Sequence, residues 1–441
     1  MGGALLTDLY ELNMAASYLR REMKAPATFS LSVRRLPPER GFLVTSGIET
    51  CLEILEDFSF EESDLAYLAT LGFDEASLDA FCGLRFTGEV RAIPEGRIVF
   101  ADEPLLEVTA PIAEAQLVET ILLNQMTFQT TLASKAARCR LAANDQVELV
   151  EFGFRRTQGF EAGIAAARVA ALVGFSATSN VIATKRYGLR PAGTMAHSYV
   201  EAFPTEVAAF RAFAEDLPER STFLVDTYDT ASGVAHAVEV IDELGLRDGL
   251  GVRLDSGDLV ALARQTRRTL DDTGHREVRI FVSGGLDEHD IAALVAEGAP
   301  VDAIGVGTRL GVSADAPFLD TSYKLVSYDG RPVAKLSEGK ATYPGAKQVF
   351  RADWLVDQVG LYGEPTPSGT EPLLEIVMSQ GRRLHPGDPV RALIEARARF
   401  EADLADLPGP ARRLRSPAAP TPVLTEALAR LTIEVRAARG Q

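Results

Sequence analysis

The stretch VRIFVSGGLDEHDIAALVAEGAPVDAIGVGT, residues 278–308, contains two apolar, strand-like runs separated by an alanine-rich, helix-like segment. The runs, 278–283 and 302–306, are each followed by a glycine-rich turn. A strand, a helix and a second strand in this order are typical of a parallel strand pair joined by a crossover helix. The stretch therefore predicts a parallel α/β unit with small-residue loops at the carboxyl ends of its strands.

The same alternation extends over much of the chain, mostly with alanine-rich helical segments between the strand-like runs. The eight runs are 147–152, 174–177, 191–196, 222–226, 250–254, 278–283, 302–306 and 323–328. Eight is the number of parallel strands that closes a (β/α) barrel, so we expect an irregular barrel. A doubly wound open sheet is the rival arrangement.

The pattern divides the chain into three predicted domains. Residues 1–111 combine helices with short, proline-punctuated strands and predict a separate N-terminal α/β domain. The barrel is expected over 112–330. Residues 331–441 form a C-terminal extension that begins with a basic, turn-rich segment at 335–351 and continues with helices.

Charge and cysteine content exclude several classes of protein. The 441 residues include 45 basic and 62 acidic side chains, a formal charge of −17. This balance argues against a nucleic-acid or membrane-surface role, because both need a basic face. The three cysteines form no CxxC pair, and no signal-like segment or long apolar run is present. We therefore expect a cytoplasmic protein without a disulfide framework or a structural zinc site.

In a barrel of this kind the chemistry collects at the carboxyl ends of the strands. Two small-residue loops open helices there and can hold a phosphate through backbone N–H groups. A single such loop is weak evidence, but loops on consecutive strands favour phosphate binding. The residues concerned are Ser283, Gly284, Gly285, Gly305, Gly307 and Thr308.

Acidic and basic groups end other strands. Asp255 lies in an acidic turn next to Arg253, which suits the hydroxyls of a sugar, a Mg²⁺ ion or a carboxylate or phosphate. Arg155 and Arg156 follow Phe152, and an aromatic face beside a guanidinium suits a flat anionic ring. We expect one of these two arginines to form a surface ion pair instead.

Residues 178–198, TSNVIATKRYGLRPAGTMAHS, place three cations and His197 within a strongly acidic chain. A local basic pocket in an acidic protein usually holds an anion. Small residues precede His197, so the imidazole can stay accessible. The combined residues point to phosphoribosyl transfer onto an aromatic acid.

At this level of detail the sequence resembles the nicotinate phosphoribosyltransferases. The matching motifs lie at 7–14, 152–156, 193–198, 225–229, 251–258, 283–287, 305–308, 335–337 and 344–349. The resemblance implies formation of nicotinate mononucleotide and diphosphate from nicotinate and 5-phosphoribosyl 1-diphosphate. It implies coupling to ATP hydrolysis through a phosphohistidine at His197, Mg²⁺ as cofactor, and the entry to NAD by salvage.

The resemblance also assigns roles to single residues. It implies that Arg253 and Thr194 hold substrate, that Phe152 faces the pyridine ring, and that Tyr10 reaches the ring from a partner subunit of a homodimer. Asp226 and Asp255 would serve the ribose, Mg²⁺ and diphosphate, with Asp255 as the metal ligand. The backbones of the two glycine loops and Thr308 would hold the 5′-phosphate.

Ser179 bears on the choice of substrate. In the related nicotinamide enzymes an aspartate stands at this position and can accept from a carboxamide, whereas a hydroxyl does not repel a carboxylate. Nicotinate is therefore favoured over nicotinamide. The length of the chain and the His197 motif speak against a quinolinate enzyme. A phosphosugar-binding protein without activity would be expected to have lost His197, Arg253 or Asp255.

Overall fold

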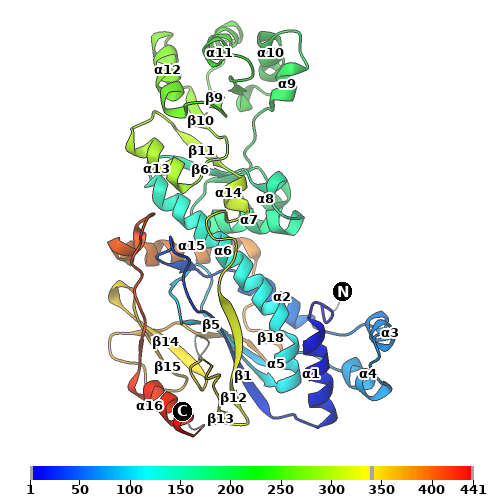
Figure 1. The fold of residues 1–441 in the computed structure, drawn as a ribbon. Coiled ribbons are helices and arrows are strands. Elements are labelled where there is room, and N and C mark those ends of the chain that lie inside the picture. Colours follow the sequence, from blue (N-terminus) through cyan, green and yellow to red (C-terminus); the bar gives the residue numbers. More distant parts are fainter. Residues whose placement is uncertain (1–2, 338–341, 439–441) are drawn as a thin grey trace. The chain divides into compact units, whose positions relative to one another are not determined.

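The computed structural model describes residues 3–337 and 342–438. The chain divides into two compact units. The first contains Met1–Ser134 and Ala316–Gln441, and the second contains Lys135–Asp315. Figure 1 labels the elements of both units. Part of the expected basic segment at 335–351, residues 338–341, lies outside the described residues.

The second unit is built on a six-stranded parallel sheet in the order β7, β6, β11, β10, β9, β8. The strands are β6 (Glu148–Glu151), β7 (Ala177–Thr178), β8 (Thr222–Leu224), β9 (Gly251–Leu254), β10 (Arg279–Val282) and β11 (Ala303–Val306). Most of their residues are buried, which is why they appear in the sequence as short apolar runs. The predicted parallel α/β character of this region is confirmed.

Helices connect these strands, and several begin at a side-chain cap. Asn180, Asp229, Asp258 and Asp287 each accept a hydrogen bond from a backbone N–H in the first turn of the following helix. The helices are α7 (Phe160–Leu172), α8 (Val181–Tyr187), α9 (His197–Glu201), α10 (Glu206–Asp216), α11 (Thr230–Leu244), α12 (Leu259–Asp272), α13 (Glu288–Ala296) and α14 (Thr308–Gly311). Short 3₁₀ turns lie at Phe154–Arg156 and Pro218–Arg220.

Two of the eight expected strands differ from the prediction. The run at 191–196 contributes only one parallel bridge, between Pro191 and Thr178. The run at 323–328 belongs to β12 (Thr321–Tyr328), which pairs antiparallel with β1 (Pro26–Val33) in the first unit. The pairings among the described strands leave β7 and β8 at the sheet edges and do not close an eight-stranded barrel.

The first unit has a seven-stranded antiparallel sheet in the order β13, β12, β1, β5, β3, β17, β18. Besides β1 and β12 it contains β3 (Glu89–Ala92), β5 (Pro104–Pro111), β13 (Arg331–Pro332), β17 (Glu375–Ser379) and β18 (Arg382–Arg383). A four-stranded sheet is formed by β16 (Glu371–Pro372), β14 (Lys347–Ala352), β15 (Val356–Leu361) and β19 (Val423–Leu424). A two-stranded sheet pairs β2 (Leu43–Val44) with β4 (Ile98–Val99).

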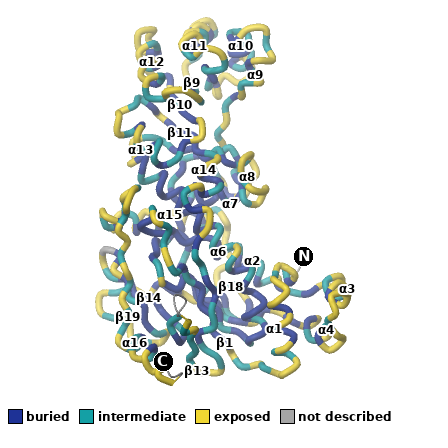
Figure 2. The backbone as a smooth tube through the Cα atoms, in the orientation of Figure 1, coloured by how far each residue is buried: buried dark blue, intermediate teal, exposed yellow. Residues whose placement is uncertain are grey.

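The helices of the first unit pack around this antiparallel core. They are α1 (Leu9–Arg20), α2 (Ile48–Glu56), α3 (Glu62–Thr70), α4 (Glu75–Cys82), α5 (Ile112–Leu117), α15 (Pro389–Asp406) and α16 (Glu426–Ala437), with 3₁₀ turns at Asp353–Leu355 and Gly409–Arg412. The long helix α6 (Glu119–Ala143) crosses the sequence boundary at Ser134. Figure 2 shows buried chain within both units.

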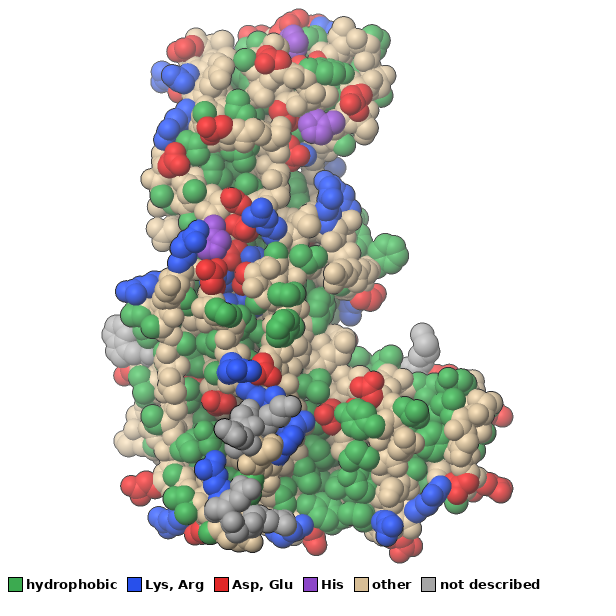
Figure 3. All heavy atoms as spheres, in the orientation of Figure 1, with side chains coloured by type: hydrophobic (Ala, Val, Ile, Leu, Met, Phe, Trp, Pro, Cys, Tyr) green, Lys and Arg blue, Asp and Glu red, His purple; other side chains and the backbone are tan. Residues whose placement is uncertain are grey.

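The surface carries charged side chains of both signs. On the face drawn in Figure 3, Lys and Arg side chains are interspersed with Asp and Glu. Across residues 3–337 and 342–438, no helix combines the length and apolarity that a membrane crossing needs.

Candidate functional site

Most of the predicted site residues lie in the second unit, at the edge of the parallel sheet that is formed by the carboxyl ends of its strands. Phe152 follows β6, Ser179 follows β7, and Asp226 lies just beyond β8. Asp255 follows β9, and the two glycine loops follow β10 and β11. Because the six strands are parallel, their carboxyl ends share this edge. The tertiary structure therefore brings together groups that are far apart in the sequence.

Arg253, the third residue of β9, is the centre of a hydrogen-bonded group. Its Nη1 donates to the Thr194 hydroxyl at 2.6 Å and to the Met195 carbonyl at 3.2 Å. Its Nη2 donates to Asp255 Oδ1 at 3.2 Å. The side chain is 11% exposed, and its buried Nε has no hydrogen-bond partner among the described residues. The guanidinium is thus held in one orientation before any ligand binds.

Asp226 and Asp255 are linked through the turn after β9. Asp226 Oδ2 accepts from the Asp255 backbone N–H at 2.9 Å and from the Ser256 hydroxyl at 2.7 Å. Asp255 Oδ1 in turn accepts from the Ser283 hydroxyl. The second Asp226 oxygen, Oδ1, is buried and has no hydrogen-bond partner in the described structure. Asp258, by contrast, caps α12, where its side chain accepts from the Ala261 backbone N–H at 3.0 Å.

Asp226 and Asp255 are the carboxylates of this edge that could bind Mg²⁺. Among the described residues, no group of three or more His, Cys, Asp and Glu side chains is placed to hold a metal ion. Magnesium is commonly bound by one or two carboxylates together with water and substrate phosphates. Asp226 and Asp255, with Asp226 Oδ1 unpaired, fit that smaller donor set.

His197 is the first residue of α9 and is half-buried. Its Nδ1 lies 3.1 Å from the Thr227 hydroxyl, just past β8. In the tautomer that donates from Nδ1, the other ring nitrogen, Nε2, keeps its lone pair and can act as a nucleophile. The histidine is therefore oriented by a neighbour on the same sheet edge as Asp226.

Glycine is required at several positions of the two loops because other atoms approach closely. Gly284 has φ of 117°, and a Cβ there would overlap the Asp255 carbonyl oxygen. A Cβ at Gly305 would lie 2.9 Å from Phe152 Cδ2, and one at Gly307 would lie 3.0 Å from the Phe152 carbonyl oxygen. The loops thus pack directly against Asp255 and Phe152. Gly285, with φ of 77°, has open space on its Cβ side.

The aromatic and basic residues after β6 separate into two environments. The Phe152 ring packs against Phe281, with ring centres 5.4 Å apart and planes tilted by 38°. Arg155 and Arg156 lie in the following 3₁₀ turn, and both are exposed. No ion pair to either arginine occurs within 3–337 and 342–438. The expectation that one of them forms a surface ion pair is not met there.

Two of the three cations of 178–198 make contacts with residues other than His197. Arg190 pairs with Glu148 at 3.0 Å, at the amino end of β6, which is the opposite edge of the sheet from His197. The Arg186 guanidinium lies 5.4 Å from the centre of the Tyr187 ring. The Arg190 contact depends on a residue 42 positions away in the chain, whereas Tyr187 directly follows Arg186.

Two charged groups at the site edge were not among the predicted site residues. Arg309, directly after Thr308, donates to Asp287 and, at 3.2 Å, to Asp290, so it ties the second glycine loop to the start of α13. Glu151, the last residue of β6, is buried and accepts from the Thr178 hydroxyl. An acidic residue closing an apolar strand is the signal that could have identified Glu151.

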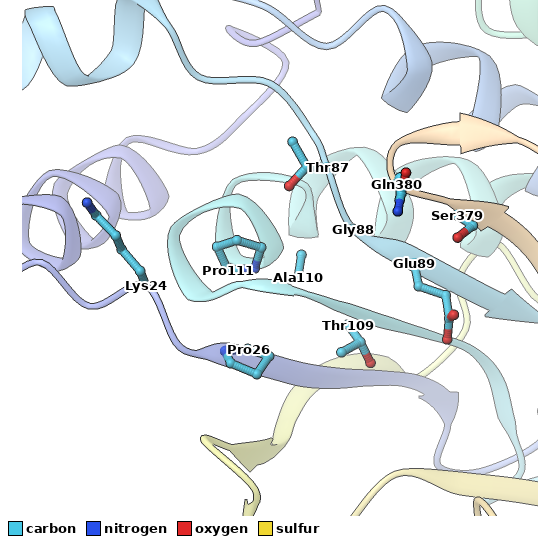
Figure 4. A pocket seen from close by; sticks show the side chains of 10 residues that line it. All are labelled: Lys24, Pro26, Thr87, Gly88, Glu89, Thr109, Ala110, Pro111, Ser379 and Gln380. Carbon is cyan, nitrogen blue, oxygen red and sulfur yellow. The ribbon is translucent and has the colours of Figure 1, made fainter.

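Tyr10 lies in the first unit, on α1, and is 46% exposed. Partial burial raises the pKa of Tyr10. The neighbouring carboxylates Glu119 and Glu11, which accept hydrogen bonds from the Tyr10 hydroxyl, raise it further. Figure 4 shows a hollow in the same unit, lined by residues that include Lys24, Glu89 and Gln380. None of the predicted site residues lines this hollow.

Comparison with known proteins identifies related sequences and structures. Residues 5–127 match the model of the nicotinate phosphoribosyltransferase N-terminal domain, and residues 147–349 match that of the nicotinate phosphoribosyltransferase family. The chain is 49% identical over 393 residues to a nicotinate phosphoribosyltransferase of Mycobacterium tuberculosis, covering 88% of this chain and 84% of that protein. It is 45% identical over 358 residues to the Bacillus subtilis nicotinate phosphoribosyltransferase, covering 79% and 73%.

A solved structure extends the likeness to the fold. The crystal structure of human nicotinic acid phosphoribosyltransferase aligns with a TM-score of 0.87 and 31% identity, covering 97% of this chain and 99% of that one. A nicotinate-nucleotide pyrophosphorylase from Pyrococcus furiosus aligns with a TM-score of 0.75 and 26% identity, covering 92% and 96%.

Proposed function

The chain belongs to the nicotinate phosphoribosyltransferase family, and from this premise we propose that it joins nicotinate to 5-phosphoribosyl 1-diphosphate. The products are nicotinate mononucleotide and diphosphate, and the reaction feeds NAD salvage. The single observation that carries the proposal is the hydrogen-bonded group of Thr194, Arg253, Asp255 and Ser283 beside two tight glycine loops.

Each part of this edge has a proposed task. Arg253 and Thr194 hold the substrate, with the guanidinium pairing a carboxylate, and Phe152 offers a flat apolar face to the pyridine ring. The backbone N–H groups of the two glycine loops, with Thr308, hold the 5′-phosphate. Phe152 follows β6, and the second glycine loop follows β11, which is the neighbour of β6 in the sheet.

Asp226 and Asp255 serve the ribose and the leaving diphosphate, and they would hold Mg²⁺. When bound, Mg²⁺ neutralises negative charge that develops on the diphosphate as it leaves. The chain's own contribution is positional, because Asp226 fixes the backbone of the Asp255 turn. Ser283 and Arg253 hold the Asp255 carboxylate, so it meets the ribose in a fixed orientation.

ATP is proposed as a co-substrate that acts through His197. The Nε2 lone pair attacks the terminal phosphorus of ATP, an N–P bond forms, and the P–O bond to ADP breaks. Water later cleaves the N–P bond and releases phosphate. Thr227 supports this step, because its hydroxyl can accept a hydrogen bond from Nδ1–H and so favour the tautomer in which Nε2 carries the lone pair.

Ser179 favours nicotinate over nicotinamide, the alternative substrate, because its hydroxyl adds no negative charge beside a carboxylate. A phosphosugar-binding protein without activity is less well supported, since His197, Arg253 and Asp255 are all retained. We also propose that the enzyme is a cytoplasmic homodimer with shared sites. The three free cysteines agree with a reducing compartment.

Product formation from nicotinate and from nicotinamide tests the proposal. Each base is incubated with phosphoribosyl diphosphate and Mg²⁺, with and without ATP. We expect nicotinate mononucleotide to form fastest with ATP. Preference for nicotinamide would overturn the interpretation of Ser179, and failure with both bases would favour the binding-protein alternative.

His197→Ala tests the route of ATP coupling. The variant should lose stimulation by ATP while keeping ATP-independent turnover. His236→Ala is the matched control, because His236 lies in the same unit but pairs with Glu206 at 2.8 Å. Retained ATP stimulation in His197→Ala would remove the phosphohistidine from the mechanism.

A further inference from the structure

Glu151 is a carboxylate with no solvent exposure at the carboxyl end of β6. Burial raises the pKa of Glu151, and hydrogen bonds from Thr178 and Gly153 oppose that rise. Burying such a group costs free energy unless both oxygens are hydrogen-bonded. Here both are: Oε2 accepts from the Thr178 hydroxyl at 2.5 Å, and Oε1 accepts from the Gly153 backbone N–H.

These two bonds connect the ends of two neighbouring strands. Thr178 is the last residue of β7, which lies beside β6 in the sheet. Its hydroxyl also accepts from the Asn180 backbone N–H at 3.0 Å. The Ser179 N–H donates to the Glu151 carbonyl at 2.9 Å. Ser179 therefore lies between Thr178, which donates to the Glu151 carboxylate, and Asn180, which donates to Thr178.

The second bond fixes the turn that carries Phe152. Gly153 lies so close to the carboxylate that a Cβ there would be 2.7 Å from Glu151 Oε1. The Phe152 N–H donates to the Val306 carbonyl at 2.8 Å, on the opposite side of β6 from Thr178. The Phe152 backbone is thus constrained from β11 on one side and through Glu151 on the other.

We propose that Glu151 is a positioning residue for recognition of the pyridine acid, acting through Phe152 and Ser179 without touching substrate. This inference rests on the proposed function, which places the ring at Phe152 and the discrimination at Ser179. The Glu151 carboxylate sets the spacing between the ends of β6 and β7, which carry Phe152 and Ser179. A side chain that served only to fill the core would need no paired acceptors here.

Glu151→Gln keeps the size of the side chain but replaces one of its two acceptor oxygens by a donor. A net hydrogen bond is worth about 1 kcal/mol, so we expect the KM for nicotinate to rise about fivefold to tenfold. The value of kcat and the KM for phosphoribosyl diphosphate should stay within about twofold, because the phosphate loops are held separately. Glu148→Gln is the matched control, since Glu148 begins the same strand and pairs with Arg190 and Arg279 at the other sheet edge.

Thr178→Val removes only the hydroxyl, leaves the carboxylate in place, and should raise the nicotinate KM in the same way. Thr178→Ser should restore it. The double variant Glu151→Gln, Thr178→Val should raise the nicotinate KM by less than the sum of the two single effects. Both changes break the same hydrogen bond, from the Thr178 hydroxyl to Glu151. Should Glu151→Gln fail to fold, the Thr178 pair alone decides the question.

An unchanged nicotinate KM in a folded Glu151→Gln or Thr178→Val variant would overturn the inference, whether or not kcat falls. A fall in the nicotinate KM would also overturn it, because it would show that the carboxylate only repels the substrate. The activity of the wild-type protein distinguishes failure of this inference from failure of the proposed function. If the wild type forms nicotinate mononucleotide and the variants match it, only the role of Glu151 is refuted.

Discussion

At the scale of single residues, buried carboxylates are held by a few named donors, and their protonation depends on those donors. Glu151 has two donors and lies at the proposed site. Glu11, on α1 of the first unit, is equally buried but lies beside another carboxylate, Glu119. The same residue type therefore has a positional task in one unit and makes stability depend on pH in the other.

Glu11 makes the folded state sensitive to pH. Burial raises the pKa of Glu11 from 4.5 to about 7, and the neighbouring carboxylate Glu119 adds to the rise. Hydrogen bonds from Thr7 and Thr120 oppose it. Because the folded-state pKa lies above that of the unfolded chain, the folded state binds the proton more tightly. The stability that this proton contributes is present below about pH 4.5 and is lost as pH rises through about 7.

Glu11→Gln should therefore flatten this dependence. Between about pH 5 and about pH 8, the melting temperature of the wild type should fall by more than that of the variant. Thermal unfolding at both pH values measures the difference. Glu75→Gln, at an exposed position of α4, is the control and should melt with the wild-type dependence. Equal slopes for the wild type and Glu11→Gln would contradict the prediction.

At the scale of elements, one buried carboxylate of α15 bonds the helix to two sheets of the first unit. Asp403 accepts from Arg97 at 2.9 Å, from Arg351 at 3.0 Å and from the Ile98 backbone N–H at 2.7 Å. Arg97 and Ile98 lie at β4, and Arg351 lies on β14. The helix thus joins two sheets through charges that are far apart in the sequence.

Asp403→Asn should loosen this attachment. The amide keeps one acceptor but leaves the buried Arg351 and the partly buried Arg97 with less negative charge, at a cost on the order of 2 kcal/mol in the free energy of unfolding. Glu401→Gln, on the same helix, breaks only an exposed pair with Arg397 and should cost less than about 0.5 kcal/mol. Urea unfolding of both variants measures the costs. Comparable values for the two would show that the Asp403 network does not anchor α15.

At the scale of the whole molecule, the proposed site needs Tyr10, which belongs to a different unit from Arg253. The proposed homodimer resolves this by supplying Tyr10 of the partner subunit. Four apolar residues near the N-terminus, Leu5, Leu6, Leu9 and Tyr10, are exposed in the isolated chain. Exposed apolar groups that lie together are typical of a surface that contacts another protein.

Complementation between two inactive variants tests this sharing. Tyr10→Ala and Arg253→Ala should each be inactive alone. Coexpressed, they should recover about a quarter of wild-type activity, because half of the dimers are hybrids and one of the two sites in each hybrid is intact. No recovery, with hybrid dimers present in the mixture, would show that Tyr10 acts within its own chain or not at all.

Local patterns in the sequence were enough to predict the parallel α/β region and many of the residues at the carboxyl ends of its strands. Short buried strands such as β9 and β10 are visible as apolar runs, and glycines at 284 and 307 mark turns that admit no side chain. The short strands predicted within residues 1–111 are confirmed by β1, β3 and β5. Periodicity and turn chemistry depend on neighbours in the chain, so they can be read without a fold.

Only the tertiary structure decided which partners these elements take. The run at 323–328 has the pattern of a strand, but its antiparallel pairing with β1 joins opposite regions of the chain. The bonds of Arg190 to Glu148, of Thr178 to Glu151 and of Asp403 to Arg351 are likewise long-range. Residue type specifies what a side chain can bond. Whether it is buried, and beside what, follows from packing between segments that are distant in sequence.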